Sequence, residues 1–246
     1  MYTDRDWLAT QNEVGQTPKK YKLGGPYIRW MHSKQKRIVL FAIDGSIDDE
    51  TLELYRGYCE AYFLGAEIAV VKPGAEIVVA RSRDGKATRT KKIPADFLGT
   101  HKVANRMNNG ILQFNASEIN TALKEYRTSD TFCILGVTNQ DLYPRPEWNF
   151  VYGQANTAAG TGIFSFTRHD VNFGQDPDEQ SDYEPAEARA IWLKRSCSTM
   201  VHEIIHMFGI KHCIFYECTM NGSNGGFESG RVEGGTSLCP SCLIKL

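Results

Sequence analysis

The chain has 246 residues, and its 28 Lys and Arg against 29 Asp and Glu leave a formal net charge of -1 at pH 7. This balance excludes a global field of either sign that would attract nucleic acid or an anionic membrane. The N-terminus lacks the apolar run of a secretory signal peptide, and no stretch approaches the roughly 20 apolar residues of a membrane span. We therefore expect a cytoplasmic or otherwise intracellular protein whose partner must be inferred from a site. The sequence leaves the oligomeric state open.

The first strong pattern along the chain is a βαβ unit. The continuous apolar run at 37–43 predicts a strand that is buried on both faces, as in a parallel sheet. A helical pattern opens at Asp48 or Asp49 and ends near Gly65, and a second strand is predicted at 67–71. A parallel pair joined by a helix predicts a right-handed crossover.

The middle of the chain predicts three more strands. A basic segment at 81–92 is typical of a solvated hairpin or loop and is a weak nucleic-acid signal. An N-capped amphipathic helix at 115–126 leads to a strand at 132–138, and the runs 149–154 and 162–167 predict a hairpin. The fold class is therefore α/β, with a twisted, mixed, mainly parallel five-stranded sheet that has an antiparallel edge strand and packs on helices.

A long helix is predicted after the acidic loop that precedes Pro185, because proline fits the first turn of a helix. Its apolar stripe ends near Phe208, and Gly209 can stop it, since a left-handed residue after a helix is least costly for glycine.

The predicted helix carries His202-Glu203-Ile204-Ile205-His206. Residues four apart lie on one helix face, so the imidazoles of His202 and His206 can converge on one zinc ion. Glu203, about 100° further round the helix, can reach a metal-bound water. Gly209 lets the chain leave the helix axis, and His212 supplies a third ligand, which leaves the open fourth position of a catalytic zinc.

This arrangement predicts hydrolysis of peptide bonds. Zinc lowers the pKa of bound water to about 7, so Glu203 can take its proton at neutral pH and later pass it to the leaving amine. The extended pattern His-Glu-x-x-His-x-x-Gly-x-x-His is specific, because each spacing has a geometric purpose. The histidines outside it, His32, His101 and His169, are interpreted as surface or core residues.

Four cysteines form two closely spaced pairs, Cys213 with Cys218 and Cys239 with Cys242. Their spacing matches a closed, tetrahedral, structural zinc site. Two disulfides or free thiols are the alternative, which a reducing compartment disfavours. Because Cys213 follows His212 directly, we hypothesise that loss of the cysteine-bound metal would also weaken the catalytic zinc. The remaining cysteines, Cys59, Cys133 and Cys197, are interpreted as ordinary buried residues.

The segments HEIIHMFGIKHC, Cys218-Thr219-Met220 and Cys239-Pro240-Ser241-Cys242 resemble the archaemetzincins, a branch of the metzincin metallopeptidases. The resemblance implies that the three motif histidines bind a catalytic zinc, that Glu203 is the general base and that Met220 forms the turn beneath the metal. It also implies a second, structural zinc on the four cysteines. Position 222 is glycine, so the tyrosine that some other metzincins use near the metal is absent.

The resemblance also suggests a domain plan and a substrate strand. We expect residues 1–35 to be an N-terminal extension, 36–208 an upper subdomain with the active-site helix, and 209–246 a lower subdomain with the cysteine site. By analogy with metzincins, the edge strand would pair with an extended peptide. A plain hairpin strand without a substrate role is the alternative. The strand residues are Phe150, Val151, Tyr152, Gly153 and Gln154.

The sequence thus predicts a zinc metallopeptidase with two zinc ions, one catalytic and one structural, and a peptide or protein substrate. One alternative is a catalytically weak, zinc-stabilised module that binds a protein partner, although such a module has no need of Glu203. Another is a sensor whose thiolates release zinc on oxidation, in which case the histidine pattern would lack a purpose.

Overall fold

The structure is a computed structural model that forms two compact units, one of residues 32–167 and the other of residues 1–31 and 168–246. The residues that it describes are 7–23, 37–82, 84, 86–128, 130–175, 182–223 and 237–246. The sequence-based domain boundaries stay a prediction.

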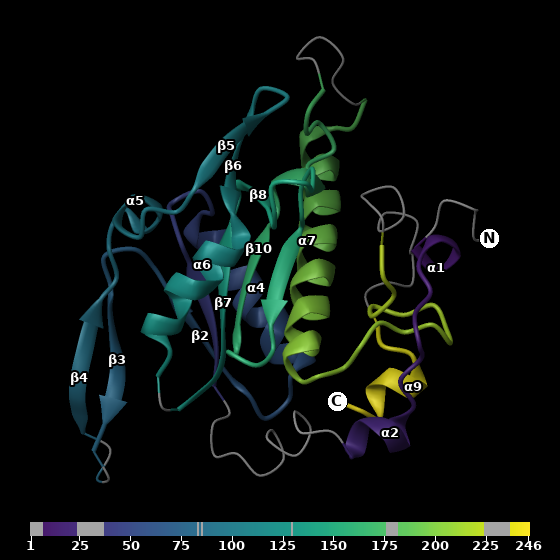
Figure 1. The fold of residues 1–246 in the computed structure, drawn as a ribbon, viewed down its shortest axis with the longest axis horizontal. Helices are drawn as coiled ribbons and strands as arrows, with labels where there is room; N and C mark the ends of the chain where they lie inside the picture. Colours follow the sequence, from purple (N-terminus) through teal and green to yellow (C-terminus); the bar gives the residue numbers. More distant parts are fainter. Residues whose placement is uncertain are drawn as a thin grey trace. The chain divides into compact units, whose positions relative to one another are not determined.

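The unit of residues 32–167 is built on a five-stranded sheet in the order β2-β1-β7-β10-β9 (Figure 1). Strands β2, β1, β7 and β10 run parallel to one another, and the edge strand β9 is antiparallel to β10. The predicted fold class, mainly parallel with an antiparallel edge, is confirmed. The strands are β1 (Arg37–Ala42), β2 (Glu67–Val71), β7 (Thr131–Thr138), β9 (Gly153–Asn156) and β10 (Thr161–Ser165).

Helices of the same unit cover both faces of this sheet. Helix α4 (Asp49–Tyr62) begins where the Asp48 carboxylate accepts a hydrogen bond from the Thr51 N–H at 2.8 Å. Its buried stripe includes Tyr55, whose ring lies 4.9 Å from that of Phe166. On the other face lies α6 (Ala116–Leu123), which is continued by the short helix η1 (Lys124–Tyr126); Figure 1 shows α6 in front of the strands and α4 behind them.

The predicted cap of α6 is confirmed, because the side chain of Asn115 accepts from the Glu118 N–H at 3.0 Å. The apolar core on this side of the sheet joins the buried stripe of α6 to alternate residues of β1, in keeping with the two-residue period of a strand. Its members include Val39, Phe41, Ile43, Phe97, Ile119, Leu123, Tyr126, Ile134, Leu142 and Ile163.

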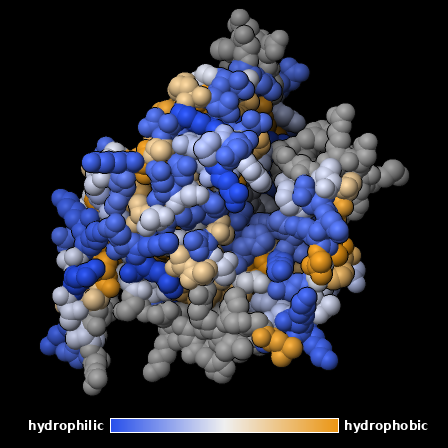
Figure 2. All heavy atoms as spheres, in the orientation of Figure 1, coloured by the Kyte–Doolittle hydropathy of each residue, from blue (hydrophilic) through white to orange (hydrophobic). Residues whose placement is uncertain are grey.

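The basic segment forms the predicted hairpin, in which β3 (Glu76–Arg81) pairs antiparallel with β4 (Ala87–Lys92). Most of β4 is exposed, and its side chains belong to the hydrophilic surface at the left edge of the face drawn in Figure 2. A three-stranded sheet of β5 (Asn105–Asn108), β6 (Ile111–Asn115) and β8 (Asp141–Tyr143) was not predicted. Residues 149–154 also differ from the prediction, because β9 starts only at Gly153.

The other unit contains the long helix α7 (Pro185–Met207), which confirms the predicted span. Proline occupies its first turn, and its buried side chains include Val201, Ile204 and Ile205. Gly209 has a φ of 84°, the left-handed conformation expected after a helix. The unit also contains α1 (Trp7–Thr10), α2 (Pro18–Lys22) and α9 (Pro240–Leu243); short elements elsewhere are α5 (Phe97–Thr100) and η2 (Thr167–His169).

The histidines and cysteines outside the motifs are placed as follows. His169 and the thiols of Cys59 and Cys133 are buried, and Cys197 is partly buried. His101 is partly buried and its Nε2 lies 2.9 Å from the Tyr126 hydroxyl. His32 lies outside the described residues. Within the described part of the chain, none of the helices is long and apolar enough to span a bilayer.

Candidate metal centre

The three motif histidines converge. His202 and His206 project from successive turns of α7, and His212 follows the left-handed turn at Gly209. Each offers a ring nitrogen, and these three atoms lie within 4.8 Å of one another. The ring centroids are separated by 4.6 Å between His202 and His206 and by 4.9 Å between His206 and His212. Three imidazole donors around one point match the ligand number of a catalytic zinc site.

Hydrogen bonds at the far side of each ring define which nitrogen faces that point. Nδ1 of His202 lies 2.7 Å from the Thr219 carbonyl oxygen, and Nδ1 of His206 lies 2.7 Å from the Ile210 carbonyl oxygen. A carbonyl oxygen can only accept, so Nδ1 carries the proton in both rings. The lone pair is then on Nε2, which is the nitrogen left to bind a metal. The two rings therefore have the tautomer that a zinc site requires.

The third histidine has a carboxylate partner. Nδ1 of His212 lies 2.7 Å from Oε1 of Glu13. The Trp7 indole packs nearly perpendicular to this ring, with the ring centroids 5.4 Å apart. Neither residue was anticipated from the sequence, because Glu13 is separated from His212 by 199 positions and belongs to no motif.

The electrostatics of the site favour neutral imidazoles. Burial, with the neighbouring rings as a second cause, lowers the pKa of His202 well below its usual value and that of His206 to about 4. Both are therefore neutral at physiological pH, the form that binds a metal. Burial also raises the pKa of the Glu203 carboxyl to about 8 in the metal-free protein. A divalent cation nearby favours the carboxylate and opposes that shift.

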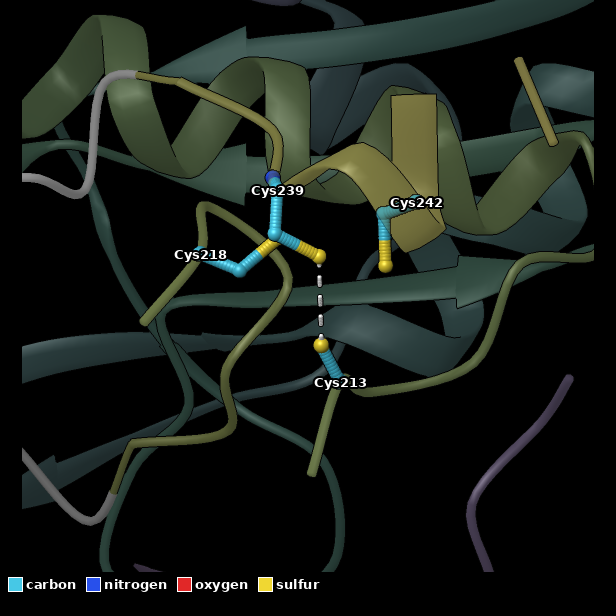
Figure 3. A group of neighbouring side chains, drawn as sticks. All are labelled: Cys213, Cys218, Cys239 and Cys242. Carbon is cyan, nitrogen blue, oxygen red and sulfur yellow. Dashed lines mark hydrogen bonds between the residues drawn. The ribbon is translucent and has the colours of Figure 1, made fainter. Parts of the chain in front are cut away.

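Figure 3 shows the four cysteine side chains directed toward one centre, two of them from the loop after α7 and Cys242 from α9. The four sulfurs lie within 4.8 Å of one another, and Sγ of Cys213 and Cys239 are 3.7 Å apart. This is far longer than a disulfide bond of about 2.05 Å. It is close to the roughly 3.8 Å between sulfurs that tetrahedral bonds of about 2.3 Å to zinc would produce.

Several donors point at the cysteine sulfurs. The backbone N–H groups of Cys239 and Met220 donate to Sγ of Cys218, at 3.3 and 3.5 Å. Lys245 is only 2 % exposed, and its Nζ donates to Sγ of Cys242 at 3.9 Å. Hydrogen bonds among the thiols lower the pKa of Cys213, which accepts them, and raise the pKa of Cys218 and Cys242. Such donors stabilise thiolates, the form of cysteine that binds a metal.

The turn around Met220 links the two clusters. Met220 is fully buried, and its carbonyl accepts from the Cys213 N–H at 2.7 Å, while the preceding Thr219 carbonyl accepts from His202. Asn221 fixes this turn: its Oδ1 accepts from the Cys218 N–H at 2.8 Å, and its Nδ2 donates to the Cys213 carbonyl at 2.7 Å. Sequence reasoning missed Asn221, although an Asx residue in a turn is a recognisable signal.

The structure explains the glycine at position 222. A Cβ there would collide with the indole of Trp7, so this position leaves room for the ring that packs on His212. The departure from the tyrosine of some other metzincins thus accompanies a contact with the N-terminal segment.

The residues of the predicted substrate strand belong to the unit of residues 32–167, whereas the histidine and cysteine clusters belong to the other unit. Only Gly153 and Gln154 of the five lie in β9. Phe150, Val151 and Tyr152 precede the strand, although the Tyr152 carbonyl already accepts from the Ser165 N–H of β10 at 2.8 Å.

Comparisons with known proteins agree with this fold. Residues 85–246 match the sequence profile of peptidase family M54. Archaemetzincin-2 of Macaca fascicularis is 34 % identical over 268 residues, which covers 100 % of the chain and 68 % of the relative. Human archaemetzincin-2 is 32 % identical with the same coverage, and human archaemetzincin-1 is 26 % identical, covering 99 % of the chain but 49 % of the relative.

Two solved structures share the fold. The archaemetzincin of Methanopyrus kandleri superposes with a TM-score of 0.57 at 22 % identity, covering 87 % of this chain and 96 % of that one. A zinc-dependent peptidase of Methanocorpusculum labreanum has a TM-score of 0.56 at 19 % identity, covering 85 % of this chain and 98 % of that one. The fold and the histidine cluster define a zinc metallopeptidase. The chain belongs to peptidase family M54, the archaemetzincins.

Proposed function

We propose that this metallopeptidase binds its catalytic zinc through Nε2 of His202, His206 and His212. The observation that carries the proposal is the convergence of three imidazoles of which two have Nδ1 bonded to a backbone carbonyl. Such bonds both orient the rings and direct the Nε2 lone pairs at one point. Three protein ligands leave one position open for chemistry. Zinc bound there supplies a Lewis acid that polarises the scissile carbonyl and acidifies water.

Glu203 is proposed as the general base. It follows His202 on α7, so its carboxyl is on the helix face next to the ligands. In the presence of a cation the ionised carboxylate takes a proton from the attacking water, and the same carboxyl then donates this proton to the leaving amine. The pKa of about 8 in the metal-free protein means that the carboxyl is mostly protonated at neutral pH, and positive charge nearby favours the ionised base. Met220 forms the floor beneath the ligands and takes no part in proton transfer.

We further propose that Cys213, Cys218, Cys239 and Cys242 bind a second zinc with a structural role. Four sulfur donors fill the coordination sphere, so no position remains for a substrate. The chain would then carry two zinc ions, one per cluster. This second ion would hold the segment that runs from His212 to α9.

The substrate is proposed to be a peptide or protein that pairs in extended form with the open edge of β9. Because Tyr152 and Ser165 form a hydrogen-bonded pair, ladder alternation turns the backbone groups of Gly153 and Ala155 outward. A side chain at Gly153 would collide with Phe164, and the side chain of Gln154 is held by Ser117 of α6. Recognition would therefore rely on main-chain hydrogen bonds, as in β-augmentation. In a set of peptides that each carry one N-methylated amide, hydrolysis should be lost when the methyl group is at every second position and kept at the positions between.

The decisive experiment compares hydrolysis of a peptide library by the wild type and by Glu203→Gln at equal zinc content. Removal of a general base should lower the rate by roughly 100- to 10,000-fold without loss of metal. The matched control is Glu187→Gln, an exposed glutamate in the first turn of the same helix, which should keep wild-type activity. Equal hydrolysis by the wild type and Glu203→Gln would contradict the proposal and favour a zinc-stabilised protein-binding module.

A further inference from the structure

The N-terminal segment Trp7–Leu23 binds the stretch of chain that carries the third histidine. The side chain of Gln16 donates to the Gly209 carbonyl at 3.0 Å and accepts from the Lys211 N–H at 3.2 Å. The hydroxyl of Tyr21, a residue that is only 3 % exposed, donates to the Phe208 carbonyl at 3.0 Å. These contacts bracket the left-handed turn on both sides. In Figure 1 the N-terminal segment, coloured purple, runs beside the yellow-green segment that follows α7.

Glu13 adds a contact to the histidine itself. Its Oε1 lies 2.7 Å from Nδ1 of His212, with the two side chains 26 % and 22 % exposed. Its second oxygen, Oε2, is buried and has no hydrogen-bond partner among the described residues. A buried carboxylate oxygen without a partner is destabilising unless positive charge is close. An imidazole bound to a divalent cation would supply that charge.

We propose that Glu13 is a positioning residue of the catalytic metal centre and that the segment Trp7–Leu23 holds the third ligand in place. The inference rests on the proposed zinc site. Glu13 accepts the Nδ1 proton of His212, which fixes the tautomer and the plane of the ring and directs Nε2 at the metal. It thereby does for His212 what the backbone carbonyls of Ile210 and Thr219 do for the other two rings.

Glu13 acts from behind the ligand and is not a fourth ligand itself. It contacts Nδ1, which is the ring nitrogen on the side away from the metal when Nε2 binds. It is also absent from the group of donor atoms that lie within 4.8 Å of one another. A carboxylate partner differs from a carbonyl because its charge raises the basicity of the imidazole. His212 should therefore bind the ion more strongly than neutral partners would allow.

The two glycines near this contact fit the same role. Gly222 leaves the space that the indole of Trp7 occupies, and Gly15 leaves space for the side chains of Ile214 and Phe215. The segment and the loop after His212 are thus shaped to fit each other on both sides of Glu13.

The test uses the full chain with Glu13→Ala and Glu13→Gln, and Asn12→Ala as an exposed control in the same segment. Zinc affinity of the histidine site is measured by competition with a chelator. Cobalt(II) substitution identifies the site, because thiolate-bound cobalt gives charge-transfer bands that imidazole-bound cobalt lacks. Glu13→Ala should weaken the histidine site by about 10- to 100-fold, as expected for loss of an outer partner of a metal ligand. Asn12→Ala should behave as the wild type.

Glu13→Gln separates positioning from general destabilisation. Its amide oxygen can still accept from Nδ1, so it should recover part of the affinity, and the cysteine site should keep its zinc in every variant. If both Glu13 variants bind zinc as the wild type does, the proposal is overturned. Should Glu13→Ala fail to fold, Glu13→Gln decides: reduced affinity of the histidine site supports the proposal, and wild-type affinity overturns it.

The same data distinguish failure of this inference from failure of the proposed function. The comparison is with His202→Ala, which should lose one zinc per chain. If His202→Ala retains all the metal of the wild type, the proposed zinc site is wrong, and the inference falls with it. If His202→Ala loses zinc but the Glu13 variants do not, only the role of Glu13 is contradicted.

Discussion

Gly209 is the hinge on which the position of His212 depends, and its replacement by alanine is a direct test of the site. Its φ of 84° lies in the left-handed region, which costs an L-residue roughly 1–2 kcal/mol. The Gly209→Ala protein can keep this conformation and accept the strain, or it can relax the turn and move His212 away from the other two proposed ligands. Gln16 and Tyr21 oppose the relaxation by binding both sides of the turn.

The size of this backbone strain determines the expected changes in zinc affinity, peptidase activity and stability. If the strain is relieved when the metal leaves, the same roughly 1–2 kcal/mol appears as a zinc dissociation constant about 5- to 30-fold higher at the histidine site. Peptidase activity at limiting zinc should fall in proportion. The free energy of unfolding of the metal-free protein should fall by no more than about 2 kcal/mol.

Gly65 provides a matched control. It has a φ of 83°, and an added Cβ would meet nothing within 4 Å, so Gly65→Ala has a similar backbone cost in the other unit. With zinc bound, both variants should be destabilised to a similar degree in denaturant titrations, but only Gly209→Ala should lose zinc affinity. Equal zinc affinity in the two variants would refute the link between the turn and the metal site.

Three further outcomes are expected. The Cys239→Ser, Cys242→Ser double variant should lose the zinc proposed at the cysteine site. It should also bind zinc more weakly at the histidine site, because Cys213 adjoins His212. Metal analysis that finds a fully retained, tightly bound zinc at the histidine site would contradict this coupling. Burial lowers the pKa of His169 to about 3, so the unfolded chain binds more protons between about pH 6.5 and pH 3, and stability falls as the pH falls. Denaturant titrations of the metal-free proteins should show a loss of about 2 kcal/mol between pH 7 and pH 5 that His169→Asn lacks; equal pH slopes would contradict it. Gly136→Ala should destabilise by roughly 1–3 kcal/mol, because its Cβ would lie 2.6 Å from an isoleucine side chain; an unchanged melting temperature would contradict it.

The elements that sequence predicted well are those with a strong local signal. The apolar run of β1, the Asp48 and Asn115 caps and the Pro185 start of α7 each depend on neighbouring residues, and the structure has all of them. The approach of the motif histidines also follows from helix periodicity and one glycine.

The strand pair β5 and β6 and the contact of Glu13 with His212 were not predicted, for two different reasons. Strands β5 and β6 are only four and five residues long, but Asn109-Gly110 between them, with φ of 50° and 77°, is a strong hairpin signal that could have been recognised. Glu13 could not have been found, because a contact between positions 13 and 212 leaves no periodic trace in a single sequence. The contacts of charged and amide side chains in an irregular segment can be identified only from the tertiary structure.

The distance along the chain between Glu13 and His212 has a consequence for biosynthesis. At translation rates of about 5–20 residues per second, His212, which lies 199 positions after Glu13, is made roughly 10–40 s later. The N-terminal segment is therefore made long before the turn that it binds, and both pairs of cysteines follow that turn. We expect that a nascent chain cannot cleave peptides until synthesis has passed all of these residues.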